Sequence, residues 1–155
     1  MAGLVTGKKI PAFSGSATGG TTISTASLKG QRFVLFFYPR ANTPGCTVES
    51  KDFRDLHASF RRRKVRVIGI SRDTLAAQEK FKEKFDFPFE LIADPDETIC
   101  NQFGVMKDKN MYGKKVRGIE RSTFLVDGNG KLLKEWRKVK VDGHAQEVLD
   151  SLAEF

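Results

Sequence analysis

The stretch FVLFFYPRANTPGCTVE at residues 33–49 decides the fold, because it ends an apolar strand and opens a helix. Residues 33–38 are apolar throughout, which is typical of a strand buried on both faces of a sheet. Thr43 is a favoured N-cap residue, and Pro44 suits the first helical position. Cys46 therefore lies in the first helical turn, where free backbone amides and the helix dipole favour a reactive thiolate.

Predicted helices and strands alternate along the next part of the chain. An amphipathic pattern predicts one helix over residues 44–62, with Phe53 and Phe60 on its apolar stripe. A short run rich in β-branched residues at 65–70 predicts a second strand. Apolar residues spaced by three or four then predict a helix over residues 74–85.

Two further helices and one hairpin are predicted in the C-terminal half. Asp94, followed by a proline and by Glu97, has the pattern of an N-cap with a capping box and predicts a helix start. After a basic loop at 107–115, two apolar runs flank the turn DGNG at 127–130, which is a strong hairpin signal. Gly143 leads into a terminal amphipathic helix.

These elements together predict an α/β fold. A βαβ unit followed by a hairpin and a last helix gives a mixed central β-sheet with helices on both faces, an order that is thioredoxin-like. Residues 1–155 fit a single domain. About the first 30 residues are rich in Gly, Ser and Thr and are expected to form an arm with short extended pieces on the edge of the core.

Composition and residue counts exclude several classes of function. The net charge of +8 is spread over separate segments, so a nucleic-acid surface is not favoured. Two cysteines, and two histidines without metal-ligand spacing, exclude a disulfide framework and a zinc site. No P-loop or dinucleotide fingerprint is present, so no cofactor is expected. No run approaches the roughly 20 apolar residues of a membrane span, and no secretory signal is found, so we expect a cytoplasmic protein.

Four separated segments carry a resemblance to a known family. Pro39, Thr43 and Cys46 stand as P-x-x-x-T-x-x-C after the apolar strand, SRD follows at 71–73, and NMYGKKVRGIERSTFLVD and WRKVKVDGHAQEVL come later in the chain. From about residue 29 onward the sequence resembles a peroxiredoxin, and more narrowly the bacterioferritin-comigratory, or PrxQ, branch. The resemblance implies an enzyme, a thiol-dependent peroxidase that reduces hydrogen peroxide and organic hydroperoxides without a cofactor.

The resemblance also implies roles for five residues. Cys46 attacks the terminal peroxide oxygen and becomes a sulfenic acid. The Thr43 hydroxyl and the Cys46 amide contact the peroxide oxygens, and the Arg121 guanidinium stabilises the thiolate and the transition state. Pro39 shields the sulfur from bulk water. Glu49, one helical turn after Cys46, is expected to orient Arg121 through a charge-assisted pair.

The sequence departs from many members of this family at the second cysteine. Lys51 stands five residues after Cys46, where many relatives carry a resolving cysteine. Residues 78–84, on the helix where other members carry it, contain no cysteine. Only Cys100 remains, and an unpaired cysteine beside the inward-facing Ile99 is most often a small buried hydrophobe. We therefore predict a one-cysteine mechanism.

In this mechanism an external thiol, namely thioredoxin, glutaredoxin or a low-molecular-weight thiol, reduces the sulfenic acid on Cys46. Two alternatives remain open: a two-cysteine peroxidase that uses Cys100, and a peroxide sensor that passes oxidation to a partner through a mixed disulfide. A thiol–disulfide oxidoreductase is disfavoured, since no C-x-x-C motif is present. We expect a monomer, because no long apolar helix stripe is left without a use within the chain.

Overall fold

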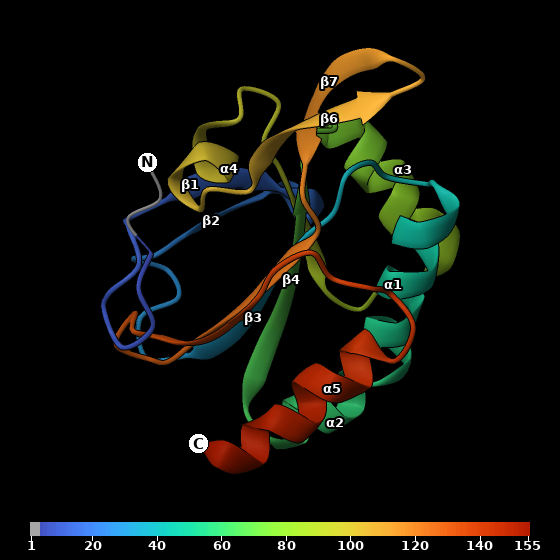
Figure 1. Cartoon of the computed structure of the whole chain (residues 1–155). Helices are drawn as coiled ribbons and strands as arrows, with labels where there is room; N and C mark the ends of the chain where they lie inside the picture. Colours follow the sequence, from blue (N-terminus) through green and yellow to red (C-terminus); the bar gives the residue numbers. More distant parts are fainter. Residues whose placement is uncertain (1–3) are drawn as a thin grey trace.

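The computed structural model describes residues 4–155 and is built around one mixed β-sheet (Figure 1). Seven strands lie in the order β2-β1-β5-β4-β3-β8-β9. Strands β3, β4 and β5 are parallel to one another, whereas β1, β2, β8 and β9 pair antiparallel. Their bounds are Ser14–Ala17 for β1, Thr21–Ser24 for β2, Arg32–Phe37 for β3, Val65–Ser71 for β4, Glu90–Ala93 for β5, Ser122–Val126 for β8 and Leu132–Trp136 for β9.

Helices cover the two faces of the sheet unequally. The larger group lies on one face and the short helix α4 on the other (Figure 1). The larger group consists of α1 (Pro44–Asp55), α2 (His57–Arg62), α3 (Leu75–Phe85) and α5 (His144–Ser151), and α4 spans Thr98–Gln102. Short 3₁₀ helices lie at Thr18–Gly20 and at Leu152–Glu154. The predicted mixed sheet with helices on both faces is confirmed.

Alternation along β3 divides the interior into two cores. Phe33, Leu35 and Phe37 pack into the core on the α4 side, whereas Val34 and Phe36 pack into the core beneath the larger group of helices. Successive side chains of a strand point to opposite faces of the sheet, so a strand that is apolar throughout contributes side chains to both cores. The buried central strand predicted from the sequence is confirmed.

The helix predicted over residues 44–62 is broken into two. Helix α1 ends at Asp55 and α2 begins at His57. Leu56 between them has φ −96° and ψ 1°, which departs from helical geometry. Phe53 and Phe60, one from each helix, still meet in the same core with ring centroids 5.8 Å apart. The apolar stripe was therefore predicted correctly, but one continuous helix was wrong.

Helix α4 begins later than the sequence predicts. Its N-cap is Glu97, with φ 63°, and not Asp94. The amide of Glu97 donates to the Asp94 carbonyl (3.0 Å), which closes a turn ahead of the helix. The Asp94 carboxylate nevertheless accepts from the amides of Ile99 (3.2 Å) and Cys100 (2.8 Å). Asp94 thus satisfies helical amides from outside the helix.

The segment expected to be a basic loop contains a hairpin instead. Strands β6 (Met106–Met111) and β7 (Lys114–Ile119) form a separate two-stranded sheet that projects beyond the main one (Figure 1). Tyr112 and Gly113 form the turn, both with positive φ. Most side chains of β7 are exposed and charged, so these strands lack the apolar alternation by which a strand is detected in a sequence.

The ends of the chain complete the sheet. The N-terminal arm contributes β1 and β2 at one edge, and β1 pairs with β5, a strand that was not predicted from the sequence. At the other edge, β8 and β9 flank the predicted turn at residues 127–130, where Gly130 N donates to Asp127 O (3.1 Å). None of the helices in the described residues is long and apolar enough to cross a membrane. Among the same residues, no cluster of His, Cys, Asp or Glu could hold a metal ion.

Candidate active site

The first turn of α1 holds Cys46, which is 1 % exposed. Thr43 precedes the helix in an extended conformation, and Pro44 is its first residue. The earliest helical hydrogen bond runs from Thr47 N to Thr43 O (2.8 Å), so the amides of Gly45 and Cys46 precede the helical ladder. These amides and the helix dipole give this end of α1 a partial positive charge, which favours an anionic sulfur or oxygen atom.

One guanidinium lies between this sulfur and a buried carboxyl group. Arg121 directly precedes β8, and its Nη2 lies 3.4 Å from Cys46 Sγ. Its Nη1 lies 2.6 Å from Oε1 of Glu49, which is wholly buried one turn after Cys46. The second carboxyl oxygen of Glu49 has no hydrogen-bond partner in the described part of the chain. Burial raises the pKa of Glu49 to about 7, although Arg121 opposes that rise.

Thr43 occupies the N-cap position, as predicted, but its side chain caps no amide. Its Oγ1 instead donates a hydrogen bond to the carbonyl of Arg40 (2.8 Å), within the loop that precedes α1. A hydroxyl that donates in this way keeps its lone pairs available to accept. The loop therefore orients the hydroxyl, and the helix amides stay free of it.

Two further residues shape the surroundings of the sulfur. Pro39 is half-buried and follows Tyr38 directly, so it begins the loop at the end of β3. Gly45 leaves space for Arg121, because a Cβ atom added at Gly45 would lie 3.2 Å from Arg121 Nη2. A larger residue at position 45 would therefore press on the guanidinium.

The segment SRD at residues 71–73 supports the same loop. Strands β3 and β4 are parallel, so the loops that follow them lie side by side. The Asp73 carboxylate accepts hydrogen bonds from Ala41 N (2.7 Å) and from the Ser71 hydroxyl. In the sequence, this segment carried part of the family resemblance but no predicted role. Its signal was a pair of polar residues directly after a buried strand, next to the cysteine loop.

Cys100 lies in a different setting, against the opposite face of the sheet. It is the third residue of α4 and is fully buried among apolar side chains. Burial, and the Asp94 carboxylate beside it, raise the pKa of the Cys100 thiol well above its usual range. This thiol is therefore held in its neutral form.

Ion pairs hold α4 from outside. Glu97 pairs with Arg72 (3.0 Å) at the end of β4 and with Arg117 (3.1 Å) on β7. Arg117 also donates to Asn101 Oδ1 (3.0 Å) on α4 itself. Helix α4 is thereby joined to both β4 and the β6–β7 hairpin.

Lysines with structural partners stand at position 51 and, within residues 78–84, at position 82, in the two places where many relatives would carry a resolving cysteine. The Lys51 ammonium lies 5.9 Å from the centroid of the Phe85 ring. The Lys82 ammonium on α3 lies 2.7 Å from Glu90 Oε1. Both cysteines of the chain, Cys46 and Cys100, are free thiols.

Comparison with known proteins identifies the family. A model described as the AhpC/TSA family matches residues 6–134. Peroxiredoxin Bcp of Bacillus subtilis is 45% identical over 149 residues, which cover 96% of this chain and 95% of that protein. Peroxiredoxin Bcp of Xanthomonas campestris is 46% identical over 137 residues, which cover 88% of this chain and 86% of that protein.

Solved structures agree with these matches. Peroxiredoxin Q of Xanthomonas campestris has a TM-score of 0.87 and 44% identity, with 92% of this chain and 90% of that chain covered. A cysteine-to-serine variant of Xylella fastidiosa PrxQ has a TM-score of 0.93 and 36% identity, with 99% and 98% covered. Two further structures are of cysteine-to-serine mutants of the Xanthomonas protein, and each mutant replaces a different cysteine.

The fold, the cysteine in the first turn of α1 and these similarities define the class of protein: the chain belongs to the AhpC/TSA family. The thioredoxin-like fold predicted from the sequence is thereby confirmed. Within the family it is a peroxiredoxin of the Bcp/PrxQ branch. It is therefore an enzyme, a thiol-dependent peroxidase with a hydroperoxide as its substrate.

Proposed function

We propose that Cys46 is the peroxidatic cysteine of a one-cysteine mechanism. The observation that carries the proposal is the 3.4 Å contact between Cys46 Sγ and the Arg121 guanidinium at the N-terminus of α1. A guanidinium keeps its charge at physiological pH, so it stabilises the sulfur as an anion. The pair between Arg121 and Glu49 fixes the direction of the guanidinium, which makes Glu49 a positioning residue.

In the first step, the Cys46 thiolate attacks the terminal oxygen of the hydroperoxide. An S–O bond forms as the O–O bond breaks, the sulfur is oxidised to a sulfenic acid, and the other oxygen leaves as water or an alcohol after taking up a proton. The Cys46 amide and Arg121 are the donors that hold the peroxide oxygens while negative charge develops, and the Thr43 hydroxyl, whose hydrogen is donated to Arg40 O, accepts from the peroxide O–H. Pro39 limits the access of bulk water to the sulfur.

In the second step, an external thiol reduces the sulfenic acid. Its sulfur forms a mixed disulfide with Cys46 as water leaves, and a second thiol then releases a disulfide and restores Cys46. Because Cys46 is 1 % exposed, the thiol reaches the sulfur only when the first turn of α1 opens. Thioredoxin, glutaredoxin and low-molecular-weight thiols are the candidate reductants.

The location of Cys100 supports an external thiol. Cys46 packs into the core on one side of the seven-stranded sheet and Cys100 into the core on the other side. A disulfide requires Cα atoms within about 7 Å, so one helix would have to unwind and pass the ends of the strands. The hydrogen bond of Asp94 to α4, and the ion pairs of Glu97 at the start of α4 with Arg72 and Arg117, oppose that movement.

The experiment is the rate of hydrogen peroxide consumption by wild type, Cys46→Ser and Cys100→Ser, with dithiothreitol and separately with thioredoxin. We expect Cys46→Ser to be inactive and Cys100→Ser to keep its activity with both reductants. Loss of only the thioredoxin-linked turnover in Cys100→Ser would identify Cys100 as the resolving cysteine and overturn the one-cysteine mechanism. A stoichiometric burst that ends in a stable adduct with a partner would instead favour the peroxide sensor.

We also propose that residues 1–155 act as one domain and as a monomer, with about the first 30 residues as its N-terminal arm. The pairing of β1 with β5 supports a common fold for the arm and the rest of the chain. A single unfolding transition is expected, and light scattering should give the mass of one chain. A stable dimer in light scattering would contradict the second expectation. The cytoplasmic location stays a prediction from the sequence.

A further inference from the structure

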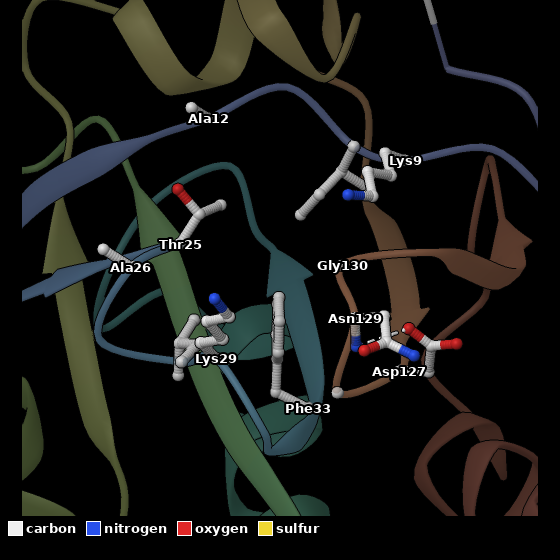
Figure 2. A pocket seen from close by; sticks show the side chains of 12 residues that line it. Lys9, Ala12, Thr25, Ala26, Lys29, Phe33, Asp127, Asn129 and Gly130 are labelled. Atoms are coloured by element: carbon white, nitrogen blue, oxygen red, sulfur yellow. Dashed lines mark hydrogen bonds between the residues drawn. The ribbon is translucent and has the colours of Figure 1, made fainter.

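A hollow lies near the start of β3, whereas Cys46 lies beyond the end of that strand. It is a cavity of about 540 Å³ bounded by residues 9–12, residues 25–33 and the turn at 127–130 (Figure 2). None of the five candidate peroxidase residues lines it. The mechanism proposed above therefore gives this cavity no role.

The inner wall of the cavity is apolar. Ile10, Leu28 and Phe33 are buried and line it. Ala12 and Ala26 continue the lining toward the rim (Figure 2). A concave site of this volume, mostly apolar with a few polar groups, is typical of small-molecule binding sites.

The segments around the cavity are tied to one another by backbone contacts. Ile10 N donates to Gly130 O (2.9 Å), and Gly30 N donates to Gly128 O (2.8 Å). Gly128 packs so closely on Gly30 that a Cβ atom added at Gly128 would lie 3.1 Å from the carbonyl carbon of Gly30. The hollow is therefore preformed by the fold, so a ligand would not need to order its walls.

Two ammonium groups lie at the rim. Figure 2 shows Lys9 and Lys29 extending from opposite sides with their nitrogen ends toward the hollow. Within the described residues, neither side chain has an ion-pair partner. The rim also carries Asp127, whose Oδ1 already accepts from the amides of Asn129 and Lys131 (2.9 Å each). The two cations thus outnumber the single acid at the rim.

We propose that this cavity binds a small amphipathic anion, namely a carboxylate with an alkyl chain. The alkyl chain lies against Phe33 and Leu28, where it leaves water, and the carboxylate lies between Lys9 and Lys29. Charge complementarity selects this class over a neutral or cationic amphiphile of the same length, because only an anionic headgroup is attracted to both ammonium groups.

The experiment is a titration of the ¹⁵N-labelled full chain with decanoate below its micelle concentration, followed by amide chemical shifts. We expect saturable shifts in residues 9–12, 25–33 and 127–130, with the first turn of α1 unaffected. Decanol should bind about fivefold more weakly or worse, because it lacks the charge. Decyltrimethylammonium should cause no saturable shift in these segments.

Two double variants separate local from general charge. Lys9→Gln with Lys29→Gln removes both rim cations and should weaken decanoate about fivefold to tenfold. Lys8→Gln with Lys131→Gln removes the same net charge from residues that do not line the cavity and should leave the affinity unchanged. Unchanged peroxidase activity in both double variants shows that each is folded.

Three results would overturn the proposal. Equal affinities for decanoate and decanol would show that the lysines do not select an anion. Equal weakening in both double variants would show that only overall charge matters. Shifts centred on α1, or none at all, would show that decanoate does not occupy this cavity. Each result is independent of the one-cysteine mechanism.

Discussion

Cys46 and Cys100 each occupy the third position of a helix, yet the charge placed beside them is opposite. At α1, the neighbour of the thiol is the Arg121 guanidinium, and the Thr43 hydroxyl leaves the helix amides free. At α4, the Asp94 carboxylate accepts from two amides of the first turn, including that of Cys100 itself. A helix N-terminus alone is therefore not enough to make a thiol reactive, because a carboxylate can occupy its amides and hold the thiol neutral, as Asp94 does at Cys100.

Each cysteine is also close to an Arg–Glu pair, and the two pairs differ in burial. The side chains of Arg121 and Glu49 are 15% and 0% exposed, whereas those of Arg72 and Glu97 are 33% and 23% exposed. Charges interact more strongly where water is excluded. The first pair can thus act on the chemistry of a sulfur, while the second mainly fastens α4.

The largest predicted difference between the two regions is catalytic. Replacing the nucleophile in Cys46→Ser should lower the rate of hydrogen peroxide reduction by at least about a thousandfold, because no other described thiol is poised to attack. Cys100→Ser should stay within about twofold of wild type. Dimedone labelling after one equivalent of peroxide, read by mass spectrometry, should place the sulfenic acid on Cys46 alone. A dimedone adduct on Cys100 would contradict this prediction, because it would show that Cys100 also reacts with peroxide.

The two arginines give the next largest contrast. Arg121→Lys keeps a positive charge but replaces a fork that contacts both Cys46 and Glu49 with a single ammonium, so peroxide reduction should slow by roughly a hundredfold. Arg72→Lys is the matched control, because Arg72 also pairs with a glutamate and lies in the setting of Cys100. Its rate should be unchanged when measured by stopped flow at 25 °C. Equal losses in both variants would mean that the effect is on folding and not on the sulfur.

The setting of Cys46 could be predicted largely from the sequence because its signals are local. An apolar strand, a loop with a proline at the first helical position, and a glutamate one turn after the cysteine lie within one short stretch. Arg121 is distant along the chain and was assigned only through the resemblance to a family. The mixed sheet followed from the order of the strands and helices, which is also a pattern over many residues.

The setting of Cys100 could be predicted much less well, since it depends on contacts that a sequence does not display. Asp94 lies outside α4 but reaches into its first turn, so the helix start was misplaced. The β6–β7 hairpin, which supplies Arg117 to this region, was missed because its strands are charged and not apolar. That the two cysteines pack on opposite faces of the sheet could be seen only in three dimensions.

The buried Glu49 should give the region of Cys46 a pH-dependent stability. Its pKa rises from an ordinary value of 4.5 to about 7 in the folded protein, so folding favours the protonated acid. This contribution is fully present below pH 4.5 and is lost as the pH rises through 7. Between pH 5 and 8 the loss should amount to roughly 2–3 kcal/mol.

Glu49→Gln cannot ionise and isolates this effect. Urea unfolding of wild type and variant at several pH values should show the variant gaining relative stability as the pH rises. Groups such as His144, whose pKa burial lowers, contribute equally to both proteins and cancel in the difference. A difference that does not change between pH 5 and 8 would mean that Glu49 stays ionised beside Arg121 throughout.

The smallest predicted effects compare the two helix starts directly. Asp94→Ala should cost about 1–2 kcal/mol of unfolding free energy, because it leaves the amides of Ile99 and Cys100 without acceptors in a buried setting. Thr43→Ala should cost less than about 0.5 kcal/mol, since its hydroxyl caps no amide and its bond to Arg40 lies at the surface.

The two variants should rank the opposite way in peroxidase activity, with the larger loss in Thr43→Ala. Thr43→Ala should slow peroxide reduction by about tenfold or more, because the proposed acceptor for the peroxide O–H is lost while the helix is intact. Asp94→Ala should keep its rate within about twofold at temperatures where it is folded, because Asp94 acts on α4 alone. If Thr43→Ala proved the less stable variant and kept its activity, Thr43 would be a structural cap and the start of α1 would not differ in kind from that of α4. If Thr43→Ala lost activity but kept its stability while Asp94→Ala did the reverse, the start of α1 would serve catalysis and the start of α4 would serve stability.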